Sequence, residues 1–131
     1  MFRVDANPEK NRLYLTLEGH MEASERREAA KAFMAAIGQL HHGFDIVHDM
    51  SGLHPTDAEG LKDLVRAQAS ARIKGLRSVV RIVKIPLTRL QFERIAEETG
   101  WPFETARTLE EADAMLDALG PAPPPEPPVG S

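Results

Sequence analysis

Histidine and aspartate side chains gather between positions 48 and 57, and these are the residues best suited to chemistry. His48 and Asp49 are adjacent, and His54 and Asp57 follow shortly after them. Imidazole nitrogens and carboxylate oxygens bind transition metals and act as general acids and bases. However, no two histidines in the chain have the i, i+4 spacing of a helical zinc motif. A small-ligand site or a metal-dependent enzyme that uses this His/Asp cluster therefore remains an alternative hypothesis.

The amino-acid composition excludes several other classes of function. The 131 residues are 42% hydrophobic and 27% charged, as in a globular protein with one core. The absence of cysteine excludes thiol catalysis, disulfides and cysteine-ligated metals. The net charge of −4 argues against nucleic acid or an anionic membrane as partner. Neither a membrane-spanning apolar run nor a signal-peptide core is found, so we expect a cytoplasmic protein without membrane insertion.

The candidate residues lie between a predicted strand and a predicted helix. An apolar run, Phe44–Val47, comes first, and a polar loop, Met50–Pro55, follows. Thr56 and Glu59 have the spacing of a capping box, which predicts that the Thr56 hydroxyl caps the helix and that the Glu59 carboxylate accepts from the N–H of Thr56. Sites in α/β sheets gather at the carboxyl ends of strands and the amino ends of helices. We therefore expect the functional surface between Asp49 and Leu61.

The elements on either side of this stretch alternate between strand and helix patterns. Period-two alternation predicts a hairpin within residues 2–18, and a helix is predicted from about residue 22 to 37. The inward face of that helix is predicted to comprise Ala30, Phe33, Met34 and Ile37. The run Leu76–Ile85 has apolar residues of both parities, which predicts a central strand covered on both faces.

The C-terminal part is predicted to hold two helices, a short strand and a tail. One helix begins at Pro86 and ends at Gly100, and its predicted inward residues are Leu87, Leu90, Ile95 and Ala96. A strand near 103–106 precedes a last helix with a second capping box, Thr108 and Glu111. Residues 121–131 are predicted to be a disordered, proline-rich tail. The order β-β-α-β-α-β-α-β-α predicts one α/β domain, residues 1–120, with helices packed on a mixed sheet.

This order, together with two short motifs, resembles the STAS domain, named for sulphate transporters and anti-sigma factor antagonists. In the antagonists, a strand ending in Asp-x-Ser precedes Asp-Ser-Ser/Thr-Gly-Leu at a helix start. Asp49 and Ser51 match the first motif, and Asp57, Gly60 and Leu61 match the second. The later succession of a glycine, a valine-rich strand, a helix ending in Thr-Gly and a final amphipathic helix also fits. The resemblance implies a STAS-like fold over residues 2–119.

The resemblance fails at the residue that the antagonists use as a switch. There, the hydroxyl residue after the aspartate is phosphorylated by a partner kinase that is also the anti-sigma factor. Here the corresponding residue is Ala58, which has no hydroxyl, and the next residue is Glu59. The resemblance therefore implies a domain that has lost the switch while keeping the surface around it. Thr56 and Ser51 are the remaining hydroxyls nearby, and phosphorylation relocated to either of them stays open.

The basic residues near the valine-rich strand suggest a further partner class, nucleic acid. No aromatic residues interleave with them to form a stacking platform for bases. We interpret them as a solvated, charge-balanced face; the set comprises Arg72, Lys74, Arg77, Arg81 and Lys84.

The leading hypothesis is a non-catalytic protein-interaction module in bacterial regulation that needs no cofactor. Its partner would be an anti-sigma factor kinase or another component of a switching complex. The predicted partner-binding residues are Asp49, Ser51, Thr56, Asp57, Ala58, Glu59, Gly60 and Leu61. A second hypothesis is a scaffold subunit that assembles with itself as a homo-oligomer or with a transporter complex, and the third is the His/Asp enzyme.

Overall fold

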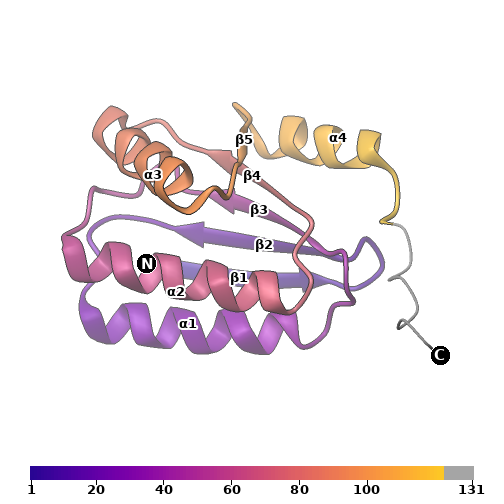
Figure 1. Cartoon of the computed structure of the whole chain (residues 1–131), viewed down its shortest axis with the longest axis horizontal. Coiled ribbons are helices and arrows are strands. Elements are labelled where there is room, and N and C mark those ends of the chain that lie inside the picture. Colours follow the sequence, from indigo (N-terminus) through magenta and orange to yellow (C-terminus); the bar gives the residue numbers. More distant parts are fainter. Residues whose placement is uncertain (123–131) are drawn as a thin grey trace.

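The computed structural model describes residues 1–122, and its elements follow the predicted order (Figure 1). A five-stranded mixed sheet has the spatial order β1-β2-β3-β4-β5. β1 (Phe2–Asn7) and β2 (Arg12–Leu17) form the predicted antiparallel hairpin. β3 (Asp45–Asp49), β4 (Ser78–Ile82) and β5 (Glu104–Thr105) continue the sheet parallel to β2. The predicted tail lies outside the described residues apart from its first two positions.

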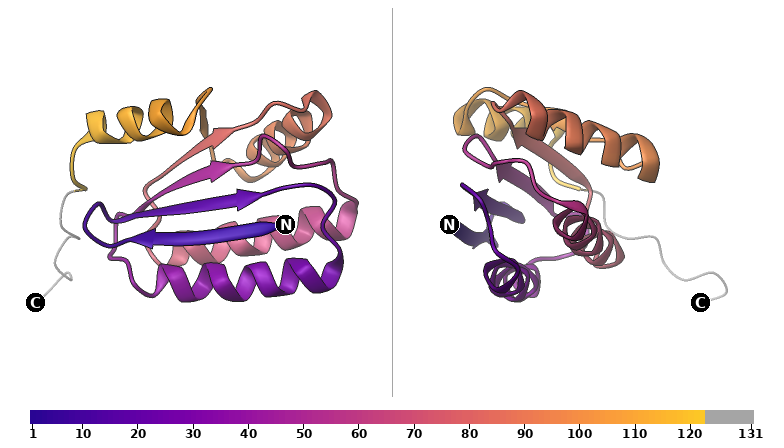
Figure 2. Two further views of the ribbon diagram at one scale, coloured as in Figure 1. Left: turned by 180° about the vertical axis from the view of Figure 1, so that it is seen from behind. Right: turned by 90° about the vertical axis from the view of Figure 1, so that its left-hand side faces the viewer.

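Helices cover both faces of this sheet, as Figure 2 shows. α1 (Ala23–Ile37) and α2 (Ala58–Ile73) lie side by side on one face, and α4 (Leu109–Leu119) packs on β3 and β4 from the other. α3 (Pro86–Thr99) follows β4, with Pro86 in its first turn as predicted. Within residues 1–122, no helix combines the length and apolarity needed to cross a bilayer.

The two central strands are buried on both faces because successive side chains point to opposite sides. Ile46 and Val79 pack with Phe33 of α1, whereas Val47 and Val80 pack with helix α4 and the segment before it. The valine-rich run is therefore the interior strand that its two-sided apolar pattern predicts. Its observed bounds, Ser78–Ile82, are shorter than the predicted ones because the chain turns toward α3 after Ile82.

Two of the predicted helix faces are partly wrong. α1 buries Ala29, Phe33, Ala36 and Ile37, while the predicted Ala30 and Met34 are exposed. α3 buries Thr88, Phe92 and Ile95, while the predicted Leu87 and Leu90 are 57% and 54% exposed. In both helices the apolar stripe is wider than the face that packs against the rest of the protein, so periodicity alone selects the wrong edge of the stripe.

The predicted solvated basic face is also wrong for its two central arginines. Arg77 lies just before β4, and its Nε and Nη2 donate to the two carboxylate oxygens of Asp45 at 3.0 and 2.7 Å. Its Nη1 donates to the carbonyl of Gly120 at 2.9 Å, at the end of α4. Arg81 of β4 is buried among aromatic rings. Arg81 is thus part of the interior, and Arg77 is half-buried in an ion pair, although the sequence pattern assigns both to the surface.

The Asp45–Arg77 pair should contribute strongly to stability, because the Asp45 side chain is only 3% exposed. Arg77→Ala would leave that carboxylate buried without its partner, and we expect a loss of about 3–5 kcal/mol in the free energy of unfolding. The control is Arg3→Ala, which breaks the exposed Arg3–Asp5 pair and should cost at most about 1 kcal/mol. Urea unfolding followed by circular dichroism measures both, and equal losses would contradict the expectation.

Candidate functional site

The loop between β3 and α2 continues the hydrogen bonding of the sheet. The Met50 N–H donates to the carbonyl of Ile82 at 2.9 Å, which extends the pairing of β3 with β4. On the other side, the Gly19 N–H donates to Gly52 at 2.8 Å and the His54 N–H donates back to Gly19 at 3.1 Å. The loop is therefore anchored to the end of β4 on one side of β3 and to the residues after β2 on the other.

Two side chains of α3 hold the second half of the loop. The Thr88 hydroxyl donates to the carbonyl of Leu53 at 2.7 Å, and Thr88 itself is fully buried. The Gln91 side chain binds both backbone groups of Thr56: it accepts from the N–H at 3.0 Å and donates to the carbonyl at 2.8 Å. Sequence reasoning missed both residues. The sequence does hold a signal for them: Thr88, Gln91 and the buried Phe92 have the i, i+3, i+4 spacing that places residues on one face of a helix.

The predicted Thr56 capping box is wrong, and the cap of α2 is Asp57. The Asp57 carboxylate accepts from the Gly60 N–H at 2.9 Å, so the helix begins at Ala58. The Glu59 carboxylate lies 3.3 Å from the Lys62 ammonium and does not return to Thr56. Both Thr and Asp favour the cap position, and the chain offers them one residue apart. Gln91 decides between them, because it binds the backbone of Thr56.

Gly60 is required by close packing at this helix start. It is buried, and a Cβ atom built there would overlap the Thr56 hydroxyl oxygen, with the Thr56 Cβ and Cγ2 only 3.0 Å away. The Thr56 side chain therefore occupies the space that any larger residue at position 60 would need. This contact gives a physical reason for glycine in the motif Asp57–Leu61.

The eight predicted partner-binding residues form two groups. Asp49 and Ser51 form the first: one Asp49 carboxylate oxygen accepts from the Ser51 N–H at 3.1 Å and from its hydroxyl at 2.8 Å, in a local turn. Residues 56–61 form the second, in which Asp57, Ala58 and Glu59 are exposed and Leu61 is half-buried. Among the described residues, no hydrogen bond or ion pair joins the two groups. The exposed part of the candidate site is thus the first turn of α2.

The His/Asp cluster proposed for metal or acid–base chemistry does not assemble. His48 is 4% exposed and lies edge-on to the ring of Phe92, on the face covered by α1 and α2. The adjacent Asp49 points to the opposite face, as alternation along a strand requires, and His54 is exposed. No three metal-binding side chains come together within residues 1–122.

His48 instead shares the interior with Arg81. Burial, and to a smaller extent the charge of Arg81, hold the pKa of His48 well below its ordinary value. The imidazole is therefore neutral at about pH 7. Burial also lowers the pKa of Arg81 to about 9, which leaves the guanidinium charged at neutral pH.

The corrected cap can be tested by mutation. Asp57→Ala removes the acceptor of the Gly60 N–H and should lower the free energy of unfolding by about 1 kcal/mol. Thr56→Ala keeps the backbone bonds to Gln91 and should cost less than about 0.5 kcal/mol, as for a substitution that removes no cap. Urea unfolding compares the two variants, and a larger loss for Thr56→Ala would restore the capping box.

The lowered pKa of His48 predicts a pH dependence of stability. Below about pH 6.5 the unfolded chain binds a proton at His48 that the folded chain does not, so stability falls as the pH falls, by at most about 1.4 kcal/mol per pH unit. His48→Phe removes this contribution. The difference in unfolding free energy between wild type and variant should be constant above about pH 7 and change below it. Parallel curves from about pH 5 to 8 would show that His48 is protonated equally in both states.

Comparisons with known proteins agree with this architecture. No model of a known protein family matches the chain, and no curated protein matches it in sequence. Among solved structures, an anti-sigma-factor antagonist (STAS) domain protein from Planctomyces limnophilus superposes with a TM-score of 0.64 and 16% sequence identity. The match covers 88% of this chain and 97% of that one. A likeness at this identity shows the fold alone: the chain has the fold of a STAS domain, which confirms the fold that the resemblance implied.

Proposed function

We propose that this protein is a non-catalytic interaction module of bacterial regulation that binds a protein partner through the first turn of α2. The observation that supports this most is the contrast between an exposed surface and a fixed backbone. Asp57, Ala58 and Glu59 are exposed, while the residue before them is held on both backbone groups by Gln91. A preorganised surface loses little conformational entropy on binding.

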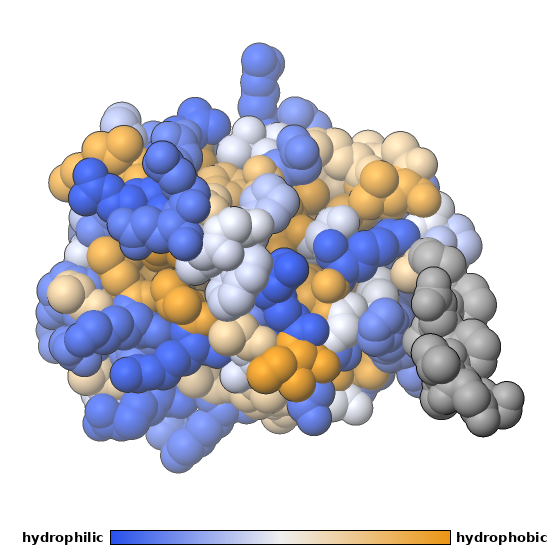
Figure 3. Space-filling model, in the orientation of Figure 1, coloured by the Kyte–Doolittle hydropathy of each residue, from blue (hydrophilic) through white to orange (hydrophobic). Residues whose placement is uncertain are grey.

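An apolar groove continues this surface between α2 and α3. Leu61 and Val65 of α2 line it together with Leu87 and Leu90 of α3, and Figure 3 shows hydrophobic surface in this region. Exposed leucines in a groove, with charged residues around them, match the usual anatomy of an interface with an apolar centre and a polar rim. The groove supplies the contact area that the short first turn lacks.

The likeness to anti-sigma factor antagonists suggests the class of partner, an anti-sigma factor kinase. Ala58 stands where the antagonists carry their phosphorylated hydroxyl, so this partner would bind without modifying the site. Of the other nearby hydroxyls, that of Ser51 donates to Asp49, and the Thr56 side chain packs against Gly60. These contacts argue against a relocated switch and favour constitutive binding.

The test uses wild type and Ala58→Ser with candidate anti-sigma factor kinases and ATP. We expect both to bind, and mass spectrometry should find phosphate only in the variant, on the hydroxyl introduced at position 58. Because phosphate adds about −1.5 to −2 charge beside Asp57 and Glu59, phosphorylation should then release the partner. Leu90→Asp in the groove should weaken binding, whereas Leu119→Asp on α4, equally exposed at 56% against 54%, should leave it unchanged.

Three results would contradict the proposal in different ways. Phosphate on wild-type Thr56 or Ser51 would show a relocated switch. Equal effects of Leu90→Asp and Leu119→Asp would remove the groove from the interface. If no kinase-type partner binds and light scattering shows a stable large assembly, the scaffold hypothesis would replace this one.

A further inference from the structure

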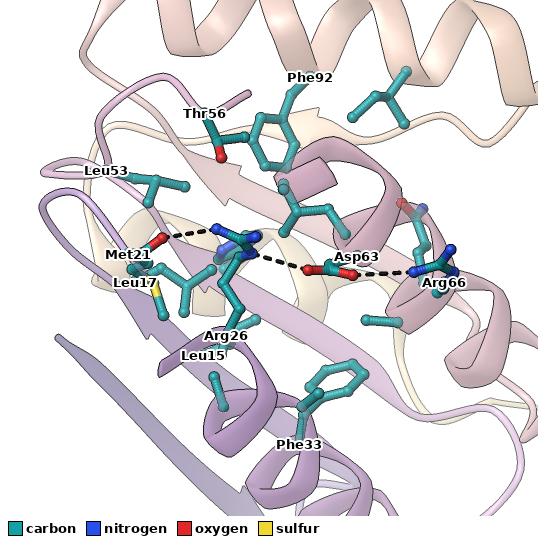
Figure 4. A pocket seen from close by; sticks show the side chains of 18 of the residues that line it. Leu15, Leu17, Met21, Arg26, Phe33, Leu53, Thr56, Asp63, Arg66 and Phe92 are labelled. Atoms are coloured by element: carbon teal, nitrogen blue, oxygen red, sulfur yellow. Dashed lines mark hydrogen bonds and ion pairs between the residues drawn. The ribbon is translucent and has the colours of Figure 1, made fainter. Parts of the chain in front are cut away.

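A cavity of about 300 Å³ lies between α1, α2 and the sheet, and Figure 4 shows it from close by. Its walls are mainly apolar and come from strands and from three helices. Leu15 and Ile46 of the sheet, Phe33 of α1, Leu64 of α2 and Phe92 of α3 are among the lining residues. A cavity with this lining is suited to an apolar group, and its volume is at the lower end of the range for small-ligand sites.

Two of the polar side chains that line the cavity, those of Arg81 and His48, have buried atoms without hydrogen-bond partners. Arg81 is 6% exposed; its Nη2 donates to Gln68 at 3.3 Å, but its Nε and Nη1 have no acceptor. His48 is 4% exposed, and its Nε2 has no partner either. Both residues line the cavity. Among the described residues, no carboxylate forms an ion pair with Arg81.

The guanidinium is held by aromatic rings. Its central carbon lies 4.8 Å from the ring centroid of Phe92 and 4.8 Å from that of Phe103. Such contacts attract the cation to the ring faces, but they provide no acceptor for the N–H groups that remain free. These N–H groups are covered by neighbouring atoms, so an acceptor in the cavity would reach them after a small shift of the side chains around them.

The charges around the cavity favour an anion. Four arginines line it, against a single aspartate, in a chain whose net charge is −4. That aspartate, Asp63, is engaged: Arg26 of α1 donates to it at 2.9 Å, and Arg66 also lies against it at 3.2 Å (Figure 4). Its negative charge is thus shared between Arg26 and Arg66, and Arg81 keeps an uncompensated positive charge at the cavity wall.

Burying such a charge lowers stability. An unpaired buried cation with free N–H groups costs free energy, and a hydrophobic side chain of similar size is often more stable in its place. The costs are offset if a ligand supplies the missing acceptor. Local departures of this kind from the pattern of a good core are typical of functional positions.

We propose that the cavity binds a medium-chain carboxylate, with the carboxylate on Arg81 and His48 and the alkyl chain against Leu15, Phe33 and Ile46. Arg81 donates from Nε and Nη1, and the neutral His48 donates from Nε2 in the tautomer that carries its proton there. Because the walls are mainly apolar, they favour an amphiphilic anion over a multiply charged ligand such as a nucleotide. This inference concerns the interior and stands independently of the surface proposed for the protein partner.

The test titrates the full chain with sodium decanoate below its micelle concentration, by isothermal calorimetry at about pH 7. We expect saturable one-to-one binding, and at least about tenfold weaker binding of the neutral analogue decanol, as for the loss of a hydrogen bond to a charged group. Arg81→Met should weaken decanoate binding by a similar factor and unfold at the same or a higher temperature than wild type. The control, Arg107→Met, removes an exposed arginine outside the cavity and should change neither quantity.

Three results would overturn the inference: no saturable binding by wild type, equal affinity for decanoate and decanol, or unchanged binding by Arg81→Met. If Arg81→Met does not fold, Ala67→Leu replaces it. Ala67 lines the cavity, so the larger side chain should block binding while Arg81 stays in place, whereas Ala118→Leu on the exposed side of α4 should not. Binding by Ala67→Leu as tight as by wild type would equally refute the site.

Discussion

The parallel pairing of β3 between β2 and β4 is the constraint on which the other features of this structure depend. A strand in this position is buried on both faces, so helices must cover both sides of the sheet. The polar groups of such a strand must also find partners in the interior. Asp45, at its start, is satisfied by Arg77, which also binds the carbonyl at the end of α4. One ion pair thereby links β3, the beginning of β4 and the last helix.

The same pairing determines where a partner could bind. Because β3 and β4 are parallel, their carboxyl ends meet at one edge of the sheet, and the loop to α2 starts there. This loop is held by Gly19 from the end of β2 and by Thr88 and Gln91 from α3. Helix α3 thus has two roles: it fixes the backbone before α2, and it contributes exposed leucines beside the exposed first turn.

The interior differs from an ordinary apolar core on the face of the sheet opposite α4. His48 and Arg81 stand at positions where alternation along β3 and β4 places apolar residues, and neither satisfies all its polar atoms. A partly unsatisfied interior is the arrangement expected if stability has been traded for binding. The helix start that the proposed partner recognises also borders the cavity, because Thr56 and Gly60 are among the lining residues.

The sequence by itself determined the order of the elements, the interior position of the valine-rich strand and the fold, because hydrophobic period and turn residues are local signals. It also predicted the Thr108 cap, because Thr108 and its partner Glu111 lie only three residues apart. The tertiary structure alone decided between Thr56 and Asp57 as the cap, since the deciding contact comes from Gln91, thirty-five residues away. It alone placed Arg81 inside and Leu90 outside. Burial depends on which elements pack together, and a single residue's type does not carry that information.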